Sequence, residues 1–258
     1  MFVYALRVVG PIRMMRNALR WQSDREARNV DSGFDRAFGT DTNAALTPRE
    51  ARIPATRRKV ATLYLPTMDG DLHAMLDALR WPAPLLRATT FVDLGSGKGR
   101  ALFIAAMRRF REVIGVELSP VLHEVAKRNL DIMRTSRTLA SPVRLVLGDA
   151  ARFDVPAGPL VVYMYHPFRE PIAEAAIAQL VASLDKAPRP AAVLYCHPTL
   201  QPCFDERVFK RSGVLRRAAD GERATRNFRI GWTVWTNTAW LEARATGGVE
   251  SRATLAQR

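Results

Sequence analysis

Three glycines at alternate positions, Gly95, Gly97 and Gly99, lie between two apolar stretches of this 258-residue chain. Residues 91–94 before them have the composition of a short buried strand, and residues 101–110 after them have the apolar spacing of a helix. A glycine turn between a strand and a helix lets a ligand approach backbone N–H groups closely, because the turn lacks Cβ atoms. The stretch therefore predicts that a ligand lies against this turn.

Two common glycine-rich motifs do not fit this stretch. A P-loop has four residues between its first glycine and its Gly-Lys pair, and a Ser or Thr after the lysine. Around Gly97 and Lys98, those two positions hold Val92 and Gly99. The dinucleotide motif Gly-x-Gly-x-x-Gly needs a third glycine where this chain has Arg100. The P-loop interpretation fails, and a nicotinamide-dependent oxidoreductase is disfavoured.

The remaining pattern, Asp-x-Gly-x-Gly-x-Gly from Asp93, resembles motif I of class I S-adenosylmethionine-dependent methyltransferases. Three further stretches resemble later motifs of that family, each at the end of a predicted strand. Glu117 ends the second strand and stands 22 residues after Gly95, close to the ~20 residues typical of an acid that binds a ribose hydroxyl. Asp149 follows the third strand, and residues 160–168 resemble the fourth motif.

The resemblance implies a cofactor, S-adenosylmethionine, and a role for each motif. Asp93 and the glycine turn are expected to hold the methionine part, Glu117 the ribose hydroxyls and Asp149 the adenine amino group. An N-terminal segment folds over the cofactor in many members of the family, which adds Tyr64 and Thr67, although Thr67 is also a candidate helix cap. The expected cofactor-binding residues are Asp93, Gly95, Ser96, Gly97, Gly99, Glu117, Leu118, Asp149, Ala150, Tyr64 and Thr67.

The fourth motif reads Tyr165-His-Pro-Phe and departs from the Asn-Pro-Pro-Tyr pattern of amino-group methyltransferases. A neutral His166 accepts one hydrogen bond or acts as a base near neutral pH, but it does not present an amide fork. We expect Tyr165 and His166 to be catalytic residues and Phe168 to stack on a planar acceptor. The alternative for His166 is a loop histidine whose hydrogen bonds are satisfied by its neighbours.

The predicted fold class is α/β, a Rossmann-like class I methyltransferase fold. It has a seven-stranded, mostly parallel sheet with an antiparallel last strand. The expected strands are residues 91–94, 113–117, 143–147, 160–165, 190–196, 214–219 and 228–235, the last two joined by a charged, glycine-containing turn. The expected helices include residues 68–79, 98–110, 120–134 and 173–184.

Residues 1–60 are expected to form a basic N-terminal arm and loop, residues 61–241 the methyltransferase domain and residues 242–258 a disordered tail. The net charge of +14 favours nucleic acid or an acidic protein as partner, while solvated surface charge is an equal alternative. The two cysteines, Cys196 and Cys203, lack zinc spacing, so we expect no metal site and a cytoplasmic location. No transmembrane segment is expected.

Motif I is also similar to that of the non-SET histone-lysine methyltransferases. Residues 34–205 resemble a bacterial group of undefined substrate, with Phe-Asp…Gly-x-Asp-Thr at 34–42 and Tyr-x-Pro-Thr at 64–67. The predicted function is methyl transfer from S-adenosylmethionine to an unidentified acceptor, for which a protein or nucleic-acid amino group is a candidate. The alternative is a non-catalytic protein with the same fold that binds RNA or an anionic surface through its basic arms.

Overall fold

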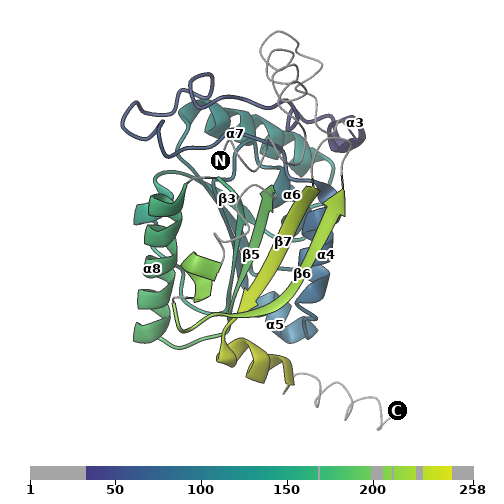
Figure 1. Cartoon of the computed structure of the whole chain (residues 1–258). Helices are drawn as coiled ribbons and strands as arrows, with labels where there is room; N and C mark the ends of the chain where they lie inside the picture. Colours follow the sequence, from purple (N-terminus) through teal and green to yellow (C-terminus); the bar gives the residue numbers. More distant parts are fainter. Residues whose placement is uncertain (1–32, 168, 199–205, 211, 225–228, 246–258) are drawn as a thin grey trace, which may run out of the picture.

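The computed structural model of the chain describes residues 33–167, 169–198, 206–210, 212–224 and 229–245. Seven strands form one sheet in the order β3-β2-β1-β4-β5-β7-β6 (Figure 1). Their bounds are β1 (Thr90–Leu94), β2 (Glu112–Glu117), β3 (Val143–Leu147), β4 (Leu160–Tyr165), β5 (Ala191–Pro198), β6 (Arg216–Ala224) and β7 (Arg229–Thr236). The first five strands are parallel, and β7 runs antiparallel to both of its neighbours. The predicted fold class is confirmed.

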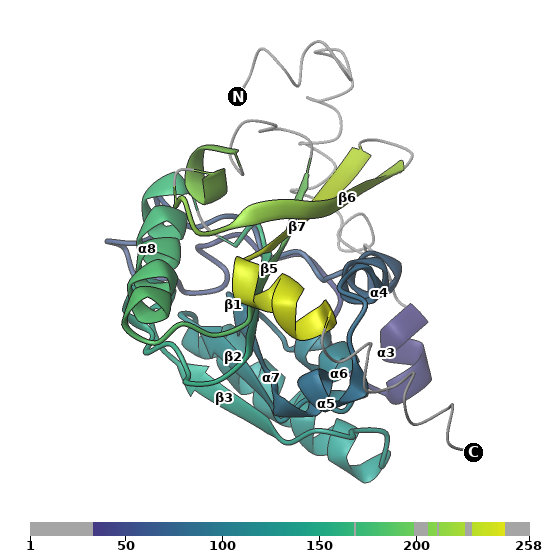
Figure 2. The same ribbon diagram turned by 90° about the horizontal axis from the view of Figure 1, so that it is seen from below.

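Helices cover both faces of the sheet. Their bounds are α3 (Gly33–Phe38), α4 (Asp69–Ala78), α5 (Ala83–Ala88), α6 (Arg100–Ala106), α7 (Pro120–Thr135) and α8 (Glu170–Lys186), followed by a helix at 238–245. Figure 2 shows α8 on one face and α4 and α6 on the other. None of the helices in the described part of the chain is long and apolar enough to cross a membrane.

The central strand β1 is buried along its whole length, as expected for a parallel strand with helices on both sides. Its side chains alternate between two cores because successive Cβ atoms point to opposite faces. Phe91 packs into the core beneath α4 and α6. Val92 and Leu94 pack into the core beneath α8.

The carboxyl ends of the parallel strands meet at one edge of the sheet. The segment between α3 and α4, residues 39–68, crosses this edge, which is the upper edge in Figure 1. We call it the crossing segment. An isolated antiparallel bridge pairs Leu46 with Tyr64 and closes the segment into a loop. The loop is held to the sheet beyond β4, because the N–H of Arg169 donates to the carbonyl of Val60 at 2.7 Å.

Three local predictions are corrected by the structure. The helix expected from residue 98 begins at Arg100, because Gly99 precedes it with a left-handed φ of 95°. The helix cap expected at Thr67 is Met68, which makes no side-chain capping bond. The arm and loop expected over residues 1–60 contain the short helix α3.

The prediction of a glycine-containing turn between the last two strands is also wrong. Asp220, Gly221 and Glu222 lie inside β6, which extends to Ala224. A Cβ atom on Gly221 would lie 2.3 Å from Cζ2 of Trp232, so this glycine makes room for an indole ring on β7. The connection between the strands, 225–228, lies outside the described residues, as do residues 1–32 of the expected arm and residues 246–258 of the expected tail.

Candidate cofactor and acceptor site

A cavity opens at the edge where the parallel strands end, beneath the segment that crosses it. Its empty space is about 950 Å³, including the open mouth. Nine of the eleven expected cofactor-binding residues line it: Asp93, Gly95, Ser96, Glu117, Leu118, Asp149, Ala150, Tyr64 and Thr67. The strand ends and the crossing segment thus bring residues up to 86 positions apart in sequence around one space.

Gly97 and Gly99, the other two expected residues, do not line the cavity. A Cβ atom on Gly97 would lie 2.2 Å from Cε2 of Tyr64, and one on Gly95 would lie 2.3 Å from Cβ of Pro167. Both glycines have positive φ, 55° and 88°. The groups that approach these glycines closely are therefore side chains of the protein itself: Tyr64 of the crossing segment and Pro167, which follows β4.

Glu117, at the end of β2, is 6 % exposed and lines the cavity. Its Oε2 accepts the N–H of Gly97 at 2.8 Å, and its Oε1 accepts the N–H of Ser119 at 2.7 Å. Burial raises the pKa of Glu117, although these backbone donors act in the opposite direction. Since each carboxylate oxygen has a second lone pair, the carboxylate can also accept hydroxyl donors from a ligand.

Asp93, at the end of β1, is 3 % exposed. Burial raises the pKa of Asp93 well above its ordinary value, and the negative charge of Glu117 raises it further. A buried carboxyl group with these neighbours is stabilised in its ionised form by a nearby cation. The site therefore favours a ligand that carries positive charge beside Asp93.

Asp149 follows β3 and begins a short 3₁₀ turn, η1 (Ala150–Arg152). Its Oδ1 accepts the N–H of Ala151 at 3.0 Å, and its Oδ2 pairs with Nη2 of Arg57 at 2.5 Å. The pair joins the crossing segment to the end of β3 and holds the Asp149 carboxylate in one orientation. Arg57 was not predicted as a site residue, and the one signal in the sequence was the basic composition of its segment.

Apolar side chains form a wall of the cavity next to these acids. Leu118 and Leu122 come from the end of β2 and the start of α7, and Ala51 and Ile53 come from the crossing segment. They pack together as a small core of their own. A flat apolar wall beside polar groups is the usual composition of a cofactor pocket.

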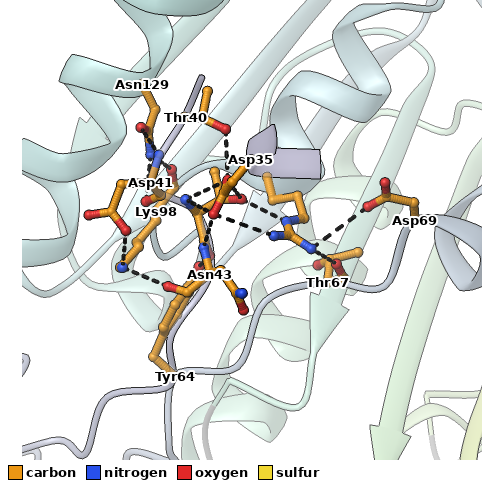
Figure 3. Close-up of polar contacts among 11 residues, drawn as sticks. Asp35, Thr40, Asp41, Asn43, Tyr64, Thr67, Asp69, Lys98 and Asn129 are labelled. Atoms are coloured by element: carbon orange, nitrogen blue, oxygen red, sulfur yellow. Dashed lines mark hydrogen bonds and ion pairs between the residues drawn. The ribbon is translucent and has the colours of Figure 1, made fainter. Parts of the chain in front are cut away.

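The crossing segment is anchored to the glycine turn by a polar network that starts at Asp35, shown in Figure 3. The carboxylate of Asp35 accepts four hydrogen bonds, from the hydroxyl groups of Thr40 and Thr42 and the N–H groups of Thr42 and Asn43. Burial raises the pKa of Asp35, but these hydrogen bonds outweigh it and hold the pKa below its ordinary value. The residues from Asp35 to Asn43, called the anchor here, are thereby folded around one carboxylate.

Arg100, at the position that excluded the dinucleotide motif, binds this anchor. It is 2 % exposed, and its Nε donates to the hydroxyl oxygen of Thr42 at 2.7 Å. Its guanidinium lies 3.9 Å from Asp35 and 4.0 Å from Asp69, and it donates to the carbonyl of Thr67 at 3.4 Å. The arginine therefore connects the start of α6 to both ends of the crossing segment.

Lys98 of the glycine turn makes a second connection to the anchor. Its Nζ donates to Oδ1 of Asp41 at 2.8 Å and to the carbonyl of Asn43 at 2.7 Å. Asn129 of α7 donates to the carbonyls of both Asp41 and Lys98 at 3.0 Å. Lys98 and Arg100, the two basic residues at this glycine turn, thus hold the crossing segment in place.

At the end of β4, Tyr165 lines the cavity and His166 does not. Nδ1 of His166 lies 2.5 Å from the hydroxyl oxygen of Tyr195, and its carbonyl accepts the hydroxyl of Thr62 at 2.7 Å. These contacts agree with the alternative prediction, in which His166 is a loop histidine whose hydrogen bonds are satisfied by its neighbours. Phe168 lies outside the described residues.

Thr67 contacts the sheet. Its hydroxyl oxygen lies 3.0 Å from the hydroxyl oxygen of Tyr163 on β4, and both residues line the cavity. Burial raises the pKa of Tyr163 well above its ordinary value. The two neutral hydroxyl groups form a polar patch between the acids and Tyr165.

No family model matches the chain, and no curated protein matches it. Among solved structures, it is similar to a magnesium protoporphyrin IX methyltransferase from Synechocystis with bound S-adenosylmethionine, at 14 % identity over 84 % of this chain and 97 % of that one, with a TM-score of 0.48. It is also similar to a methyltransferase from Thiobacillus denitrificans in complex with S-adenosylhomocysteine, at 16 % identity over 67 % and 92 %, with a TM-score of 0.46. A methyltransferase from Leishmania major is similar at 14 % identity over 65 % and 71 %, with a TM-score of 0.48. At these values, the function of this chain has to be inferred from its own residues.

Proposed function

We propose that the chain is an S-adenosylmethionine-dependent methyltransferase. One observation carries the proposal: the acids at the ends of three neighbouring strands, Asp93, Glu117 and Asp149, line a single cavity beside a glycine turn. Each acid suits a different part of a molecule with a cationic end, a diol and an exocyclic amino group. The cavity also has the apolar wall that such a ligand needs.

The residues divide between the parts of the cofactor. Asp93 neutralises the positively charged methionine end, for which its raised pKa is the physical reason. Glu117 accepts the ribose hydroxyls with the lone pairs that Gly97 and Ser119 leave unused. Asp149 accepts the adenine amino group while Arg57 holds its other side, and the purine lies against the wall of Leu118, Leu122 and Ile53.

When bound, the cofactor supplies a methyl group on a sulfonium, so that an acceptor lone pair forms a bond to carbon while the carbon–sulfur pair leaves with sulfur. The protein aligns the acceptor and excludes water. Tyr165 and Tyr163 border the space beside the methionine end, and the crossing segment covers it. We propose His166 as a positioning residue that holds the end of β4 through its contact with Tyr195, and Phe168 remains a predicted acceptor contact.

A transfer assay tests this proposal. The purified protein is incubated with S-adenosylmethionine labelled in its methyl group and with RNA, protein and lipid fractions. We expect one fraction to be labelled by the wild type and by Glu112→Ala, which alters the half-buried start of the same strand. Glu117→Ala is expected to label none. Equal labelling by Glu117→Ala and Glu112→Ala would contradict the assigned site, and no labelling of any fraction would favour the non-catalytic alternative.

A further inference from the structure

The crossing segment has an apolar inner side and a basic outer side. Its inner side chains line the cavity, among them Ala51, Ile53 and Val60. Between them, the side chains of Arg49, Arg52, Arg58 and Lys59 are exposed. The segment 47–61 contains five basic residues, including Arg57, and a single acid, Glu50, whose carboxylate accepts hydrogen bonds from Thr47. Its positive charge therefore faces the solvent at the mouth of the cavity.

Two basic side chains from other elements join this surface. Arg152 is exposed in η1, three residues after Asp149, and Asp149 is paired with Arg57. Arg169 is exposed next to Val60, whose carbonyl accepts its N–H. Together they form a surface that we call the basic rim, made of Arg49, Arg52, Arg58, Lys59, Arg152 and Arg169.

We propose that the basic rim binds the phosphate backbone of a nucleic-acid strand and thereby brings a nucleobase to the acceptor end of the cavity. The acceptor half of this inference rests on the proposed function, whereas binding to the strand does not. Arg152 follows β3 and Arg169 follows β4, and each is close in sequence to residues that line the cavity, Ala150 and Pro167. A strand that follows the rim passes the side of the cavity lined by Tyr165.

The chemistry of the rim favours nucleic acid over other anionic partners. Five of its six members are arginines, whose planar guanidinium matches phosphate oxygens in a bidentate fashion. A membrane-binding surface would carry several apolar side chains among the basic ones. The large apolar side chains that are exposed in the described part of the chain are Leu147 and Leu241, and of these only Leu147 lies at the end of the sheet that carries the rim.

The rim can be tested with three substitutions that break no described contact. Arg49→Gln, Arg52→Gln and Lys59→Gln are combined in the full chain, because these side chains are exposed and the structure shows no hydrogen bond or ion pair for them among the described residues. The matched control combines Arg80→Gln, Arg87→Gln and Arg109→Gln, which are also exposed and remove the same charge. Arg80 precedes α5, Arg87 lies in α5 and Arg109 precedes β2, at the opposite edge of the sheet from the rim (Figure 1).

Binding is measured by fluorescence anisotropy with a labelled single-stranded RNA and a DNA of the same sequence, over a range of salt concentrations. Each phosphate contact on a single strand contributes about 0.7 to the slope of log K against log salt. Loss of three contacts therefore reduces the slope by about 2 and weakens binding on the order of 100-fold at 0.1 M salt. The control variant is expected to bind like the wild type, and the difference between RNA and DNA reports a role for the 2′-hydroxyl.

Several results would overturn the inference. These are no binding to either strand, equal loss in the two variants, or rim-dependent binding to polyglutamate or to phosphatidylserine vesicles at lower concentration than to nucleic acid. Failure of strand binding together with saturable binding of S-adenosylmethionine would remove this inference alone. Strand binding without cofactor binding would instead contradict the proposed function and leave the rim in place.

Discussion

Replacing Arg100 with methionine tests whether the anchor and the glycine turn are one structural unit. The change keeps a long apolar side chain at a position that is 2 % exposed but removes the charge. The hydrogen bond to Thr42 is lost, and the carboxylates of Asp35 and Asp69 lose the guanidinium that lies 3.9 and 4.0 Å away. The buried charge of Asp35 is then stabilised by its hydrogen bonds alone.

The expected loss of stability follows from these contacts. Removing one partner of a buried ion pair typically lowers the free energy of unfolding by about 3–5 kcal/mol. Asp35 retains its four hydrogen bonds and its side chain is 15 % exposed, so we expect a value near the lower end, about 3 kcal/mol. The matched control is Arg108→Met, because Arg108 pairs at 2.9 Å with the largely exposed Asp77. Loss of that pair is expected to cost less than about 1 kcal/mol.

Urea titrations of the wild type and both variants measure the two differences. Arg100→Met should also weaken cofactor binding, since the segment that carries Tyr64, Arg57 and Thr67 loses its attachment. The double variant Arg100→Met with Asp35→Asn should lose less free energy of unfolding than the sum of the losses in the two single variants, because both substitutions remove the same ion pair. The reasoning is refuted if Arg100→Met and Arg108→Met lower the free energy of unfolding equally.

Three further predictions concern the cavity. Gly97→Ala should weaken cofactor binding strongly, because a Cβ atom there lies 2.2 Å from the ring of Tyr64 and φ is 55°. Gly70→Ala, at an exposed glycine with open space around it, should leave cofactor binding unchanged. Equal affinities of the two variants in calorimetry would contradict this. Because the pKa of Asp93 is raised by burial and by Glu117, its contribution to stability is present below its ordinary value of 3.8 and is lost as pH rises through the raised pKa. A positively charged ligand favours the ionised form, so cofactor binding should release protons in that window, seen as a binding enthalpy that depends on the buffer, and Asp93→Asn should abolish the effect. His166→Ala should leave cofactor affinity unchanged and reduce methyl transfer by less than tenfold if the residue only holds the end of β4 in position; a loss on the order of 10²–10⁴-fold would indicate a general base instead.

The elements with strong local signals were predictable from the sequence. β1, β2, β4 and β5 are mostly apolar runs, as strands buried on both faces must be. The edge strand β3 is partly exposed but is also mostly apolar. The helix expected at 120–134 is α7, and it begins at the predicted residue because the Ser119 hydroxyl accepts the N–H of Leu122 at 3.1 Å. The acids after β1, β2 and β3 come together because parallel strands present their carboxyl ends at one edge.

The contacts between distant residues were not predictable in the same way. Arg100 and Asp35 are 65 positions apart, and the sequence alone showed the arginine only as a departure from a glycine motif. The pairing of Arg57 with Asp149 likewise depends on how the crossing segment folds over the sheet. Gly221 resembled a turn residue, but its role is set by an indole ring on the neighbouring strand. Such roles are decided by tertiary packing and leave no periodic signal.

Calorimetric titration of the purified full chain with S-adenosylmethionine, with NAD as the control ligand, tests the central proposal most directly. We predict saturable binding of S-adenosylmethionine at one site per chain and no binding of NAD. Binding of NAD alone, or of neither ligand by a folded protein, would contradict the assignment of Asp93, Glu117 and Asp149 to this cofactor.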